Sequence, residues 1–513
     1  DNGIENSTLM CMMPHQWKYS DASYKKAESG KALIYSSVRG DLRIHEGNEF
    51  NYTQKFNGII PQYTTPDESG SYDTEWMYAY LKQFTDSALK SYWVADPYWQ
   101  GKKSHPITMG ILIADQLGEY ETRDKLISVL RKIMENWLTY DGEEDFPYYM
   151  YYHTSWGAVS GDGGDHGMAI NLSDHHFLWA YFIFPAAVLA SYDSQFVEDY
   201  GDMVELLIRD AMNPDKDDEL LPYMRNFDVY EGHSWAGGYA DNDSGNNQES
   251  ASESLFSWAS LYLWGTLTGN DTYRDAGVFG FSNEMDAVQQ YWFDYDKDNW
   301  VKEWPYDVVG QVYGGINFYG TFFGGQPLYV YGIQWLPISE YLTYYGMNQE
   351  RCAEIYQGLL DDTDEAMKKA VIVARNEGKT EEEIQTMLDT YPQADTGWQH
   401  ITWPFLSQTN PTLALQKFLA NDDKVQKTDT ANTYWFINSM KELGTKTTDI
   451  VATGDCSAAV YYNKNTNKYT ATVWNPTNAT KKVTFKNANG TTLGTATIGA
   501  KALVSFEVYK DKK

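Results

Sequence analysis

The sequence predicts a mainly α-helical protein in which helical hairpins form a toroid, with a β-rich region before the helices and a small β-sandwich module after them. Apolar residues recur at helical spacing from about Thr74 to about Thr445. Long loops rich in glycine and aromatic residues join the expected helices, which favours a toroid over a bundle with short turns. After Thr445 the pattern alternates and contains Asn-Gly and Asn-Thr turns, as in β-hairpins.

The N-terminal region, residues 1–73, is expected to be the remnant of a β-sandwich. The runs TLMCMM, KALIYSSV and DLRIHEG are short, alternating or apolar, and they are broken by Gly, Pro and Asp. The sequence shows no signal peptide. Because its acidic and aromatic composition suggests a secreted protein, we expect Asp1 to begin a mature or trimmed chain.

Residues 74–445 are expected to form the helical domain. The run TEWMYAYLKQFTDSALKSYW opens it, and two more helices are expected around a polar turn at residues 120–122. The loops expected at 151–176, 222–250 and 312–337 are long and rich in glycine and aromatic residues. Ordered loops of this length are usually functional, so we expect the site there.

Residues 446–513 are expected to form the C-terminal β-sandwich module. Two interpretations of this module differ in the role of its aromatic residues. A packing or spacer module would use them in its core, and a sugar-binding module would expose them on its surface. We favour packing. The aromatic residues concerned are Tyr461, Tyr462, Tyr469 and Trp474.

The charge and composition exclude several classes of partner. With 40 basic and 71 acidic residues the net charge is −31, which repels nucleic acids and anionic membrane surfaces. There is no apolar run of about 18 residues for a membrane span. The 41 Tyr and 18 Trp exceed ordinary packing needs and suit a cleft for a neutral sugar polymer. We expect a monomer that binds neither nucleic acid nor membrane.

Cysteine and histidine spacing gives no metal site. Cys11, Cys352 and Cys456 permit at most one disulfide and lack the spacing of metal ligands. His175 and His176 are adjacent, so their side chains should point apart. We expect neither a metal nor a cofactor.

The stretch 241–265 carries two candidate catalytic carboxylates. A helix is expected from about Asn246, which would place Glu249 and Glu253 on one face of its first turns among amide and hydroxyl side chains. Such a mixture suits a polyhydroxylated ligand. The alternative is a solvated helix start, because the helix dipole favours acids there.

Asp174 is the upstream partner expected for Glu249. Glycosidic cleavage usually needs one carboxylic acid and one carboxylate. Glu249, near a positive helix end, should stay ionised as a base, whereas Asp174, if enclosed by Phe177 and Trp179 and facing Glu249 or Glu253, should have a raised pKa and act as the acid. The alternative for Asp174 is a simple N-cap.

Several segments resemble, in the right order, the motif series of glycoside hydrolase family 81, the endo-β-1,3-glucanases. They are SDHHFLWAYFIFPAAVLA, LLIRDAMNP, RNFDVYEGHSWAGG, GNNQESASESLFSWASLYLWG and YGIQWLP. The resemblance spans roughly residues 75–340, and TLMCMMPHQ and YSSVRGDLRIHEG resemble the end of the family's N-terminal β-sandwich. It implies an (α/α)6 barrel and inverting endo-hydrolysis of a laminarin-like β-1,3-glucan.

Carried over by position, the resemblance makes Asp174 the general acid and Glu249 the general base, with Glu253 a second acidic residue. We expect Glu253 to support the pair. An inverting pair stands roughly 6.5–9.5 Å apart to admit water. The motifs that line the family's cleft contain the expected substrate-binding residues, His175, His176, His233, Trp235, Asn247 and Gln248.

Three other functions stay open at this stage. The chain could hydrolyse another β-linked glucan, or bind glucan at a surface without cutting it. A polysaccharide lyase on a helical toroid is the third, but it needs an acidic sugar, which this many acidic residues would repel.

Overall fold

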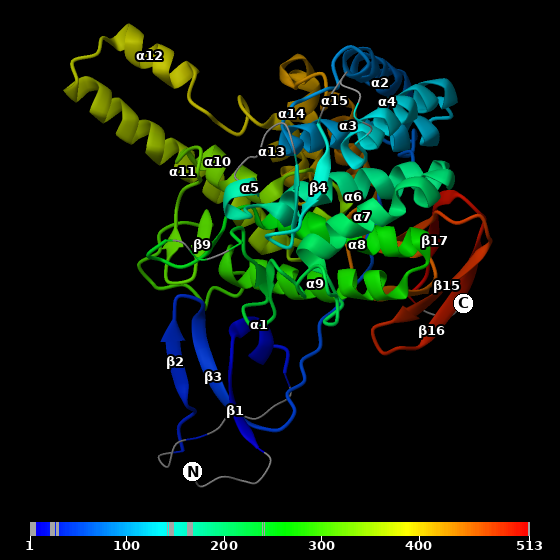
Figure 1. Ribbon diagram of the computed structural model, residues 1–513. Coiled ribbons are helices and arrows are strands. Elements are labelled where there is room, and N and C mark those ends of the chain that lie inside the picture. Colours follow the sequence, from blue (N-terminus) through cyan, green and yellow to red (C-terminus); the bar gives the residue numbers. More distant parts are fainter. Residues whose placement is uncertain are drawn as a thin grey trace.

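The computed structural model describes most of the chain, namely residues 7–20, 26, 30–140, 142, 148–161, 168–238, 240 and 242–510. Within these ranges, six helical segments form an inner ring, and their α-helices are labelled in Figure 1. Each contacts the next, and the last contacts the first, which closes the ring. They are α3 (Pro97–Gln116), α6 (His175–Tyr192), α8 (Ala251–Thr268), α10 with the 3-10 helix η1 (Pro327–Gly332 and Ile333–Trp335), α13 (Gln399–Ser407) and α15 (Thr430–Leu443).

Each inner helix also packs against an outer helix, so the ring consists of helical hairpins. Nearly all residues of α6 and α8 are buried, as expected for helices that are apolar all round. The predicted (α/α)6 toroid is therefore confirmed. The outer helices are α2 (Thr74–Ala88), α4 (Tyr120–Leu138), α7 (Gln195–Met212), α9 (Asp271–Tyr291), α11 (Gln349–Asn376) and α14 (Pro411–Ala420).

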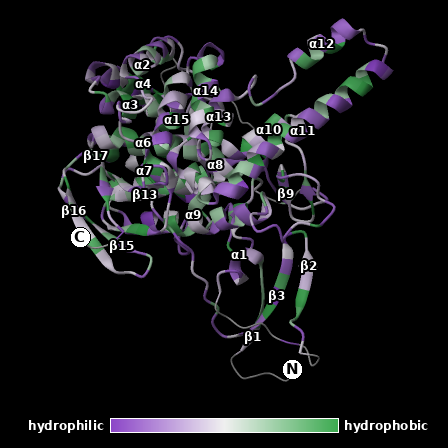
Figure 2. Cartoon of the chain, turned by 180° about the vertical axis from the view of Figure 1, so that it is seen from behind, coloured by the Kyte–Doolittle hydropathy of each residue, from purple (hydrophilic) through white to green (hydrophobic). Residues whose placement is uncertain are grey.

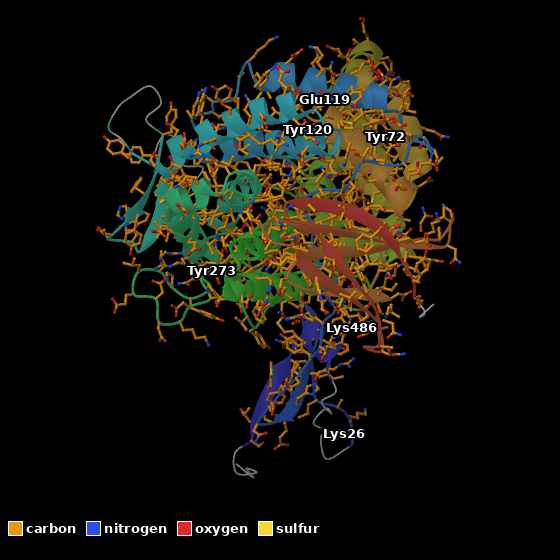
Figure 3. All side chains as sticks on the ribbon, turned by 90° about the vertical axis from the view of Figure 1, so that its right-hand side faces the viewer. Lys26, Tyr72, Glu119, Tyr120, Tyr273 and Lys486 are labelled. Carbon is orange, nitrogen blue, oxygen red and sulfur yellow. The ribbon has the colours of Figure 1, made fainter. Side chains whose placement is uncertain are left out.

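Some predicted helix boundaries are wrong. The turn expected at 120–122 lies at 117–119, where Gly118 has φ 73° and α4 already begins at Tyr120 (Figure 3). Apolar spacing predicts two helices in NQERCAEIYQGLLDD and DEAMKKAVIVARNEG, but they form one helix, α11. It extends with α12 (Glu381–Asp389) away from the ring (Figure 2). The run PISEYLTYYG also predicts a helix, and the structure has the 3-10 helix η2 (Glu340–Met347) there.

A three-stranded antiparallel sheet forms the N-terminal region, with strand order β1-β3-β2. Its strands match the three predicted runs: β1 (Thr8–Met12), β2 (Ile34–Ser37) and β3 (Gly40–Gly47). A short helix, α1 (Pro14–Trp17), joins this sheet to the ring because the backbone N–H of His15 donates to the Tyr291 hydroxyl of α9 at 3.3 Å.

Two antiparallel sheets make up the C-terminal module, which lies alongside the helices (Figure 3). Tyr461 and Trp474 are buried in the core shared with the helical ring, which supports the packing interpretation. One sheet has the order β11-β13-β14-β17 and the other β12-β15-β16. The strands are β11 (Thr445–Lys446), β12 (Ile450–Gly454), β13 (Ser457–Asn463), β14 (Lys468–Asn475), β15 (Lys481–Asn487), β16 (Thr492–Ile498) and β17 (Ala502–Val508).

The segment 57–64 passes between the helical ring and this module, since the Asn57 N–H donates to the Tyr344 hydroxyl and its Nδ2 donates to the Val460 carbonyl of β13. Gly58 has φ 63°, and a Cβ on it would lie 1.7 Å from the Ala458 carbonyl oxygen of β13. Only glycine fits here. The three cysteines are free.

Candidate active site

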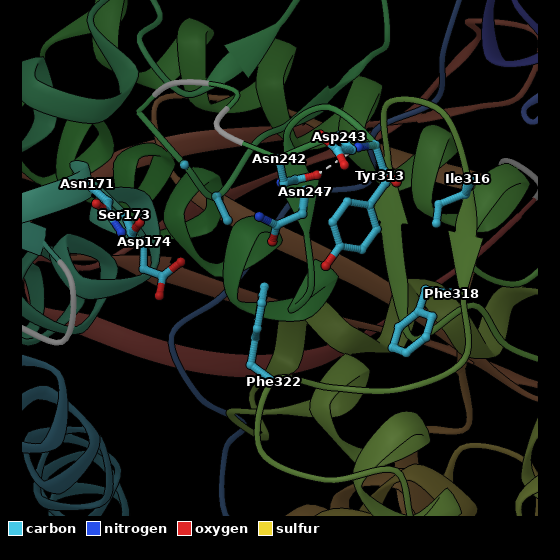
Figure 4. Close-up of a pocket in the computed structure, with 13 residues that line it drawn as sticks. Asn171, Ser173, Asp174, Asn242, Asp243, Asn247, Tyr313, Ile316, Phe318 and Phe322 are labelled. Carbon is cyan, nitrogen blue, oxygen red and sulfur yellow. Dashed lines mark hydrogen bonds between the residues drawn. The ribbon is translucent and has the colours of Figure 1, made fainter.

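A pocket of about 700 Å³ opens where the three long loops meet at one end of the ring (Figure 4). One wall comes from the loop before α6, and the opposite wall comes from the loop between α9 and α10. Polar and aromatic side chains share the lining, which consists of Asn171, Ser173, Asp174, Ala236, Gly237, Asn242, Asp243, Ser244, Asn247, Tyr313, Ile316, Phe318 and Phe322.

Asp174 lies at the N-terminus of α6, with its carboxyl group in the pocket (Figure 4). It occupies the N-cap position, but its side chain makes no capping hydrogen bond. The cap interpretation therefore does not account for this carboxylate. Its backbone has φ 63°, in the left-handed region, and Leu172 has φ 51°. Such conformations are uncommon away from glycine, and they cluster at functional sites.

Backbone hydrogen bonds tie the loop before α6 to the loop before α8. The Asp174 N–H donates to the Ala236 carbonyl at 2.8 Å, and the Ala236 N–H donates to the Asn247 carbonyl at 2.7 Å. Gly238 permits this approach, because a Cβ there would lie 2.4 Å from Cβ of Leu172. The segment before Glu249 is thereby tied to the segment that carries Asp174.

Glu249 follows a strand, which corrects the predicted helix start. Asn247 and Gln248 form β8 (Asn247–Gln248), paired with Tyr313 and Val312 of β9 (Gln311–Tyr313). The helix begins only at Ala251, so Glu249 and Glu253 do not share a helical face. The Glu249 Oε1 atom accepts the backbone N–H of Phe322 at 2.7 Å.

Glu253 lies in the first turn of α8, with 2% of its side chain exposed. Three donors converge on its Oε1 atom. These are the Tyr181 hydroxyl at 2.6 Å, the Tyr98 hydroxyl at 3.0 Å and the Lys102 Nζ at 3.1 Å. Hydrogen bonds of this kind fix the position of the carboxylate.

Burial and neighbouring carboxylates raise the pKa values of Asp174 and Glu249. Burial, and then the charges of Glu249 and Glu253, raise the pKa of Asp174 to about 8. The direction agrees with the expectation for an acid. Burial also raises the pKa of Glu249 to about 7, opposed by the Phe322 N–H. The prediction that Glu249 stays fully ionised at neutral pH is therefore wrong, because burial outweighs its hydrogen bond and no helix begins at it.

His175 does not line the pocket. Its side chain is fully buried, with Nδ1 2.5 Å from Asp210 Oδ2 and Nε2 3.2 Å from the Met168 carbonyl oxygen. Asp210 also accepts the Trp179 Nε1–H at 2.7 Å and the backbone N–H of Val159 at 2.9 Å. His175 therefore braces the start of α6 from behind.

Three more of the predicted substrate-binding side chains are buried away from the pocket. His176 pairs with Gln248, their Nε2 atoms 3.1 Å apart, and burial lowers the pKa of His176 to about 3. His233 is buried against Trp235, which is half-buried and donates from Nε1 to Asp228 at 3.3 Å. Of the predicted substrate-binding set, only Asn247 lines the pocket.

The residues that sequence reasoning missed are Tyr98, Lys102 and Tyr181 around Glu253, and Tyr313, Phe318 and Phe322 in the opposite wall. The aromatic loop 312–337 pointed to the last three as a group. Nothing in the spacing of Tyr98 or Lys102 distinguishes either from an ordinary residue of α3.

Among the described residues, no three His, Cys, Asp or Glu side chains gather where they could hold a metal ion. The expectation of a reaction without metal stays a prediction. No helix in the described ranges has both the length and the apolar content of a membrane span.

The ring of helical hairpins and the carboxylate-lined pocket at one end define an (α/α)6-toroid protein. The model of the "Glycosyl hydrolase family 81 C-terminal domain" matches residues 74–370. The chain therefore belongs to glycosyl hydrolase family 81, as the motifs indicated.

Two curated relatives are named glucan endo-1,3-beta-D-glucosidase. The one from Acetivibrio thermocellus is 32% identical over 496 residues, covering 96% of this chain and 59% of the relative. The one from Thermobifida fusca is 33% identical over 500 residues, covering 96% and 60%. This chain thus spans about three fifths of the length of these relatives.

A solved structure of a mutant "Glycoside hydrolase family 81 from Clostridium thermocellum" has the same fold. It superposes with a TM-score of 0.84 at 29% identity, over 99% of this chain and 65% of that one.

Proposed function

We propose that this protein is a secreted endo-β-1,3-glucanase that hydrolyses laminarin-like glucan with inversion of configuration and without a metal. The observation that carries the proposal is that Asp174 lines the pocket while Glu249 accepts the N–H of Phe322 from the opposite wall, with pKa values of about 8 and about 7. As pH rises, Glu249 loses its proton first and Asp174 keeps its proton to a higher pH, as a base and an acid should. The names of the relatives supply the substrate.

In the proposed reaction, the Asp174 carboxyl donates its proton to the glycosidic oxygen as the bond from that oxygen to the anomeric carbon breaks. Glu249 accepts a proton from a water molecule that attacks the anomeric carbon from the opposite face. The products are two shorter glucans, the new reducing end having inverted configuration. Asp174 and Glu249 then exchange protons with solvent to regain their starting states.

The neighbouring groups support these roles. Phe322 N–H holds Oε1 of Glu249, which leaves Oε2 for the water. Glu253 contributes negative charge that raises the pKa of Asp174. The rings of Tyr313, Phe318 and Phe322 offer faces on which pyranose rings can stack.

The test replaces each proposed catalytic carboxylate with its amide. Asp174→Asn and Glu249→Gln should each lower kcat on laminarin by about 10²–10⁴-fold, because general acid or base catalysis is lost. Folding and glucan binding should change little. Asp243→Asn is the matched control, since Asp243 lines the same pocket without entering the proposed reaction.

Proton NMR of the first product tests inversion, by reading the anomeric form soon after mixing. Near-normal turnover by either amide variant, or a first product of retained configuration, would contradict the mechanism. Assay of a β-1,4-glucan in parallel separates the proposed substrate from another β-linked glucan. Glucan binding without any new reducing ends would favour the non-catalytic alternative.

A further inference from the structure

A row of aromatic rings lies on a β-hairpin outside the pocket. Strand β4 (Met150–His153) pairs antiparallel with β5 (Ala158–Gly161), which is buried throughout. In β4 the side chains alternate. Met150 is buried and the Tyr152 hydroxyl donates to the Leu220 carbonyl at 2.8 Å, so Tyr151 and His153 project from the opposite face.

Three further rings extend this row at both ends. Tyr149 precedes β4, and its ring centroid lies 6.0 Å from that of Tyr151 and 4.5 Å from that of Tyr140. At the other end, His153 lies 6.4 Å from Tyr151 and 5.1 Å from Trp156 in the hairpin turn. Successive rings are tilted by 38° to 54°. We call these five residues the hairpin row.

Much of the hairpin row is open to solvent. Tyr140 is 68% exposed, Trp156 47% and Tyr151 37%. Exposed rings forgo the free energy that burial of aromatic area provides, so core packing does not explain them. A contiguous exposed apolar patch on a soluble protein usually marks an interaction site.

The chemistry of the hairpin points to a neutral sugar polymer. Residues 148–161 contain no charged side chain, although the protein carries a net charge of −31. Pyranose rings present C–H faces that stack on aromatic rings, and tyrosine hydroxyls can bond to sugar hydroxyls. Anionic polymers would be repelled by the surrounding protein.

The hairpin row also lies close to the pocket in the fold. Strand β5 contacts the short helix α5 (Met168–Asn171), beside which Figure 1 shows β4. Asn171, the last residue of α5, lines the pocket three residues before Asp174. A chain that leaves the pocket past Asp174 would therefore reach this hairpin.

We propose that the hairpin row is a second binding site for a neutral glucan chain, holding polymer outside the pocket. The identity of that glucan as β-1,3-linked rests on the proposed function. The binding itself does not depend on hydrolysis, so the two proposals can fail separately.

The experiment measures migration in native gels that contain laminarin, hydroxyethylcellulose or no polysaccharide. The host is Asp174→Asn, so hydrolysis does not alter the gel. Adding Tyr151→Ala and Trp156→Ala should weaken retardation by about tenfold for each ring removed. Tyr151→Phe, which keeps the ring, should retain most of the retardation.

Trp76→Ala is the matched control, because Trp76 on α2 is also 47% exposed but lies on another element. With Asp174 restored, the double alanine variant should hydrolyse short oligosaccharides at the unchanged rate but show a raised KM on long laminarin. Circular dichroism checks that the variant is folded.

Equal migration of the host and the folded double variant would overturn the proposal, as would a host that neither polysaccharide retards. So would light scattering that shows wild-type dimers which the double variant lacks, since the row would then bind a second copy. Loss of retardation in the double variant upholds the site even if wild-type protein proves inactive on laminarin.

Discussion

Two buried glutamates pair with lysines in the part of the chain that the structure describes, and their oxygens have different hydrogen-bond partners. Glu340, at the junction with the C-terminal module, accepts Lys446 Nζ at 2.6 Å and the Tyr461 hydroxyl on Oε1, and the Ile60 N–H at 3.0 Å on Oε2. Among the described residues, all donors to Glu253 reach Oε1 alone. A carboxylate whose two oxygens both accept hydrogen bonds from the protein stabilises the fold. A carboxylate with one oxygen left without such a donor can bind a ligand.

The surroundings of the lysines differ in the same way. Lys446 is fully buried, donates to the Gly58 carbonyl at 2.8 Å and lies 4.1 Å from the Tyr344 ring centroid. Burial lowers its pKa. Lys102 keeps 22% of its side chain exposed, so water can solvate it if its partner is lost. The first pair should therefore govern stability and the second should govern activity.

The largest effect is expected from Glu340→Ala. It leaves the Lys446 ammonium buried without a counter-charge and should cost about 3–5 kcal/mol in the free energy of unfolding. Denaturant titration measures this cost. Asp364→Ala, which breaks an exposed pair with Lys368, should change the free energy of unfolding far less, because water screens the pair. Similar losses in both variants would contradict the distinction between the two pairs.

The next effect is expected from Glu253→Gln. It removes the charge that helps to raise the pKa of Asp174, so Asp174 should lose its proton at lower pH. The alkaline limb of kcat/KM against pH should shift downward, and kcat should fall by about 10-fold or more. Stability should change by less than in Glu340→Ala.

The Asp243→Asn control should leave the alkaline limb unmoved. The outcome that contradicts this is an alkaline limb that does not shift in Glu253→Gln while the maximal kcat/KM falls. The charge of Glu253 would then not set the pKa of Asp174, and its role would be purely steric.

The sequence predicted the helical ring more accurately than the candidate active site. The apolar runs of α6 and α8 are buried on every side, so periodicity and composition were enough to predict them. The start of α8 was missed because Asn247 and Gln248 pair with β9, at separations of 66 and 64 residues that local propensity cannot reveal.

The histidines show the same limit. A polar residue beside Asp174 was expected to face a ligand, but His175 faces Asp210, and Gln248 faces His176. Which way a side chain points at a helix start depends on the left-handed backbone at Leu172 and Asp174, which no spacing rule signals.

The smallest effect is expected from Asp174. Its carboxyl group should cost stability when it ionises, whereas the hydrogen-bonded carboxylate of Glu340 should not. The pKa of Asp174 rises from the usual 3.8 to about 8 on folding, so the folded state binds the proton more tightly than the unfolded state. Stability from this group is fully present below pH 4 and is lost as pH rises toward 8. Asp174→Asn has no proton to lose. Its unfolding free energy should match that of the wild type near pH 4 and exceed it by on the order of 1–3 kcal/mol at pH 9. Thermal denaturation at both pH values measures the difference, and a constant offset would show that Asp174 is not destabilised by ionising in the fold.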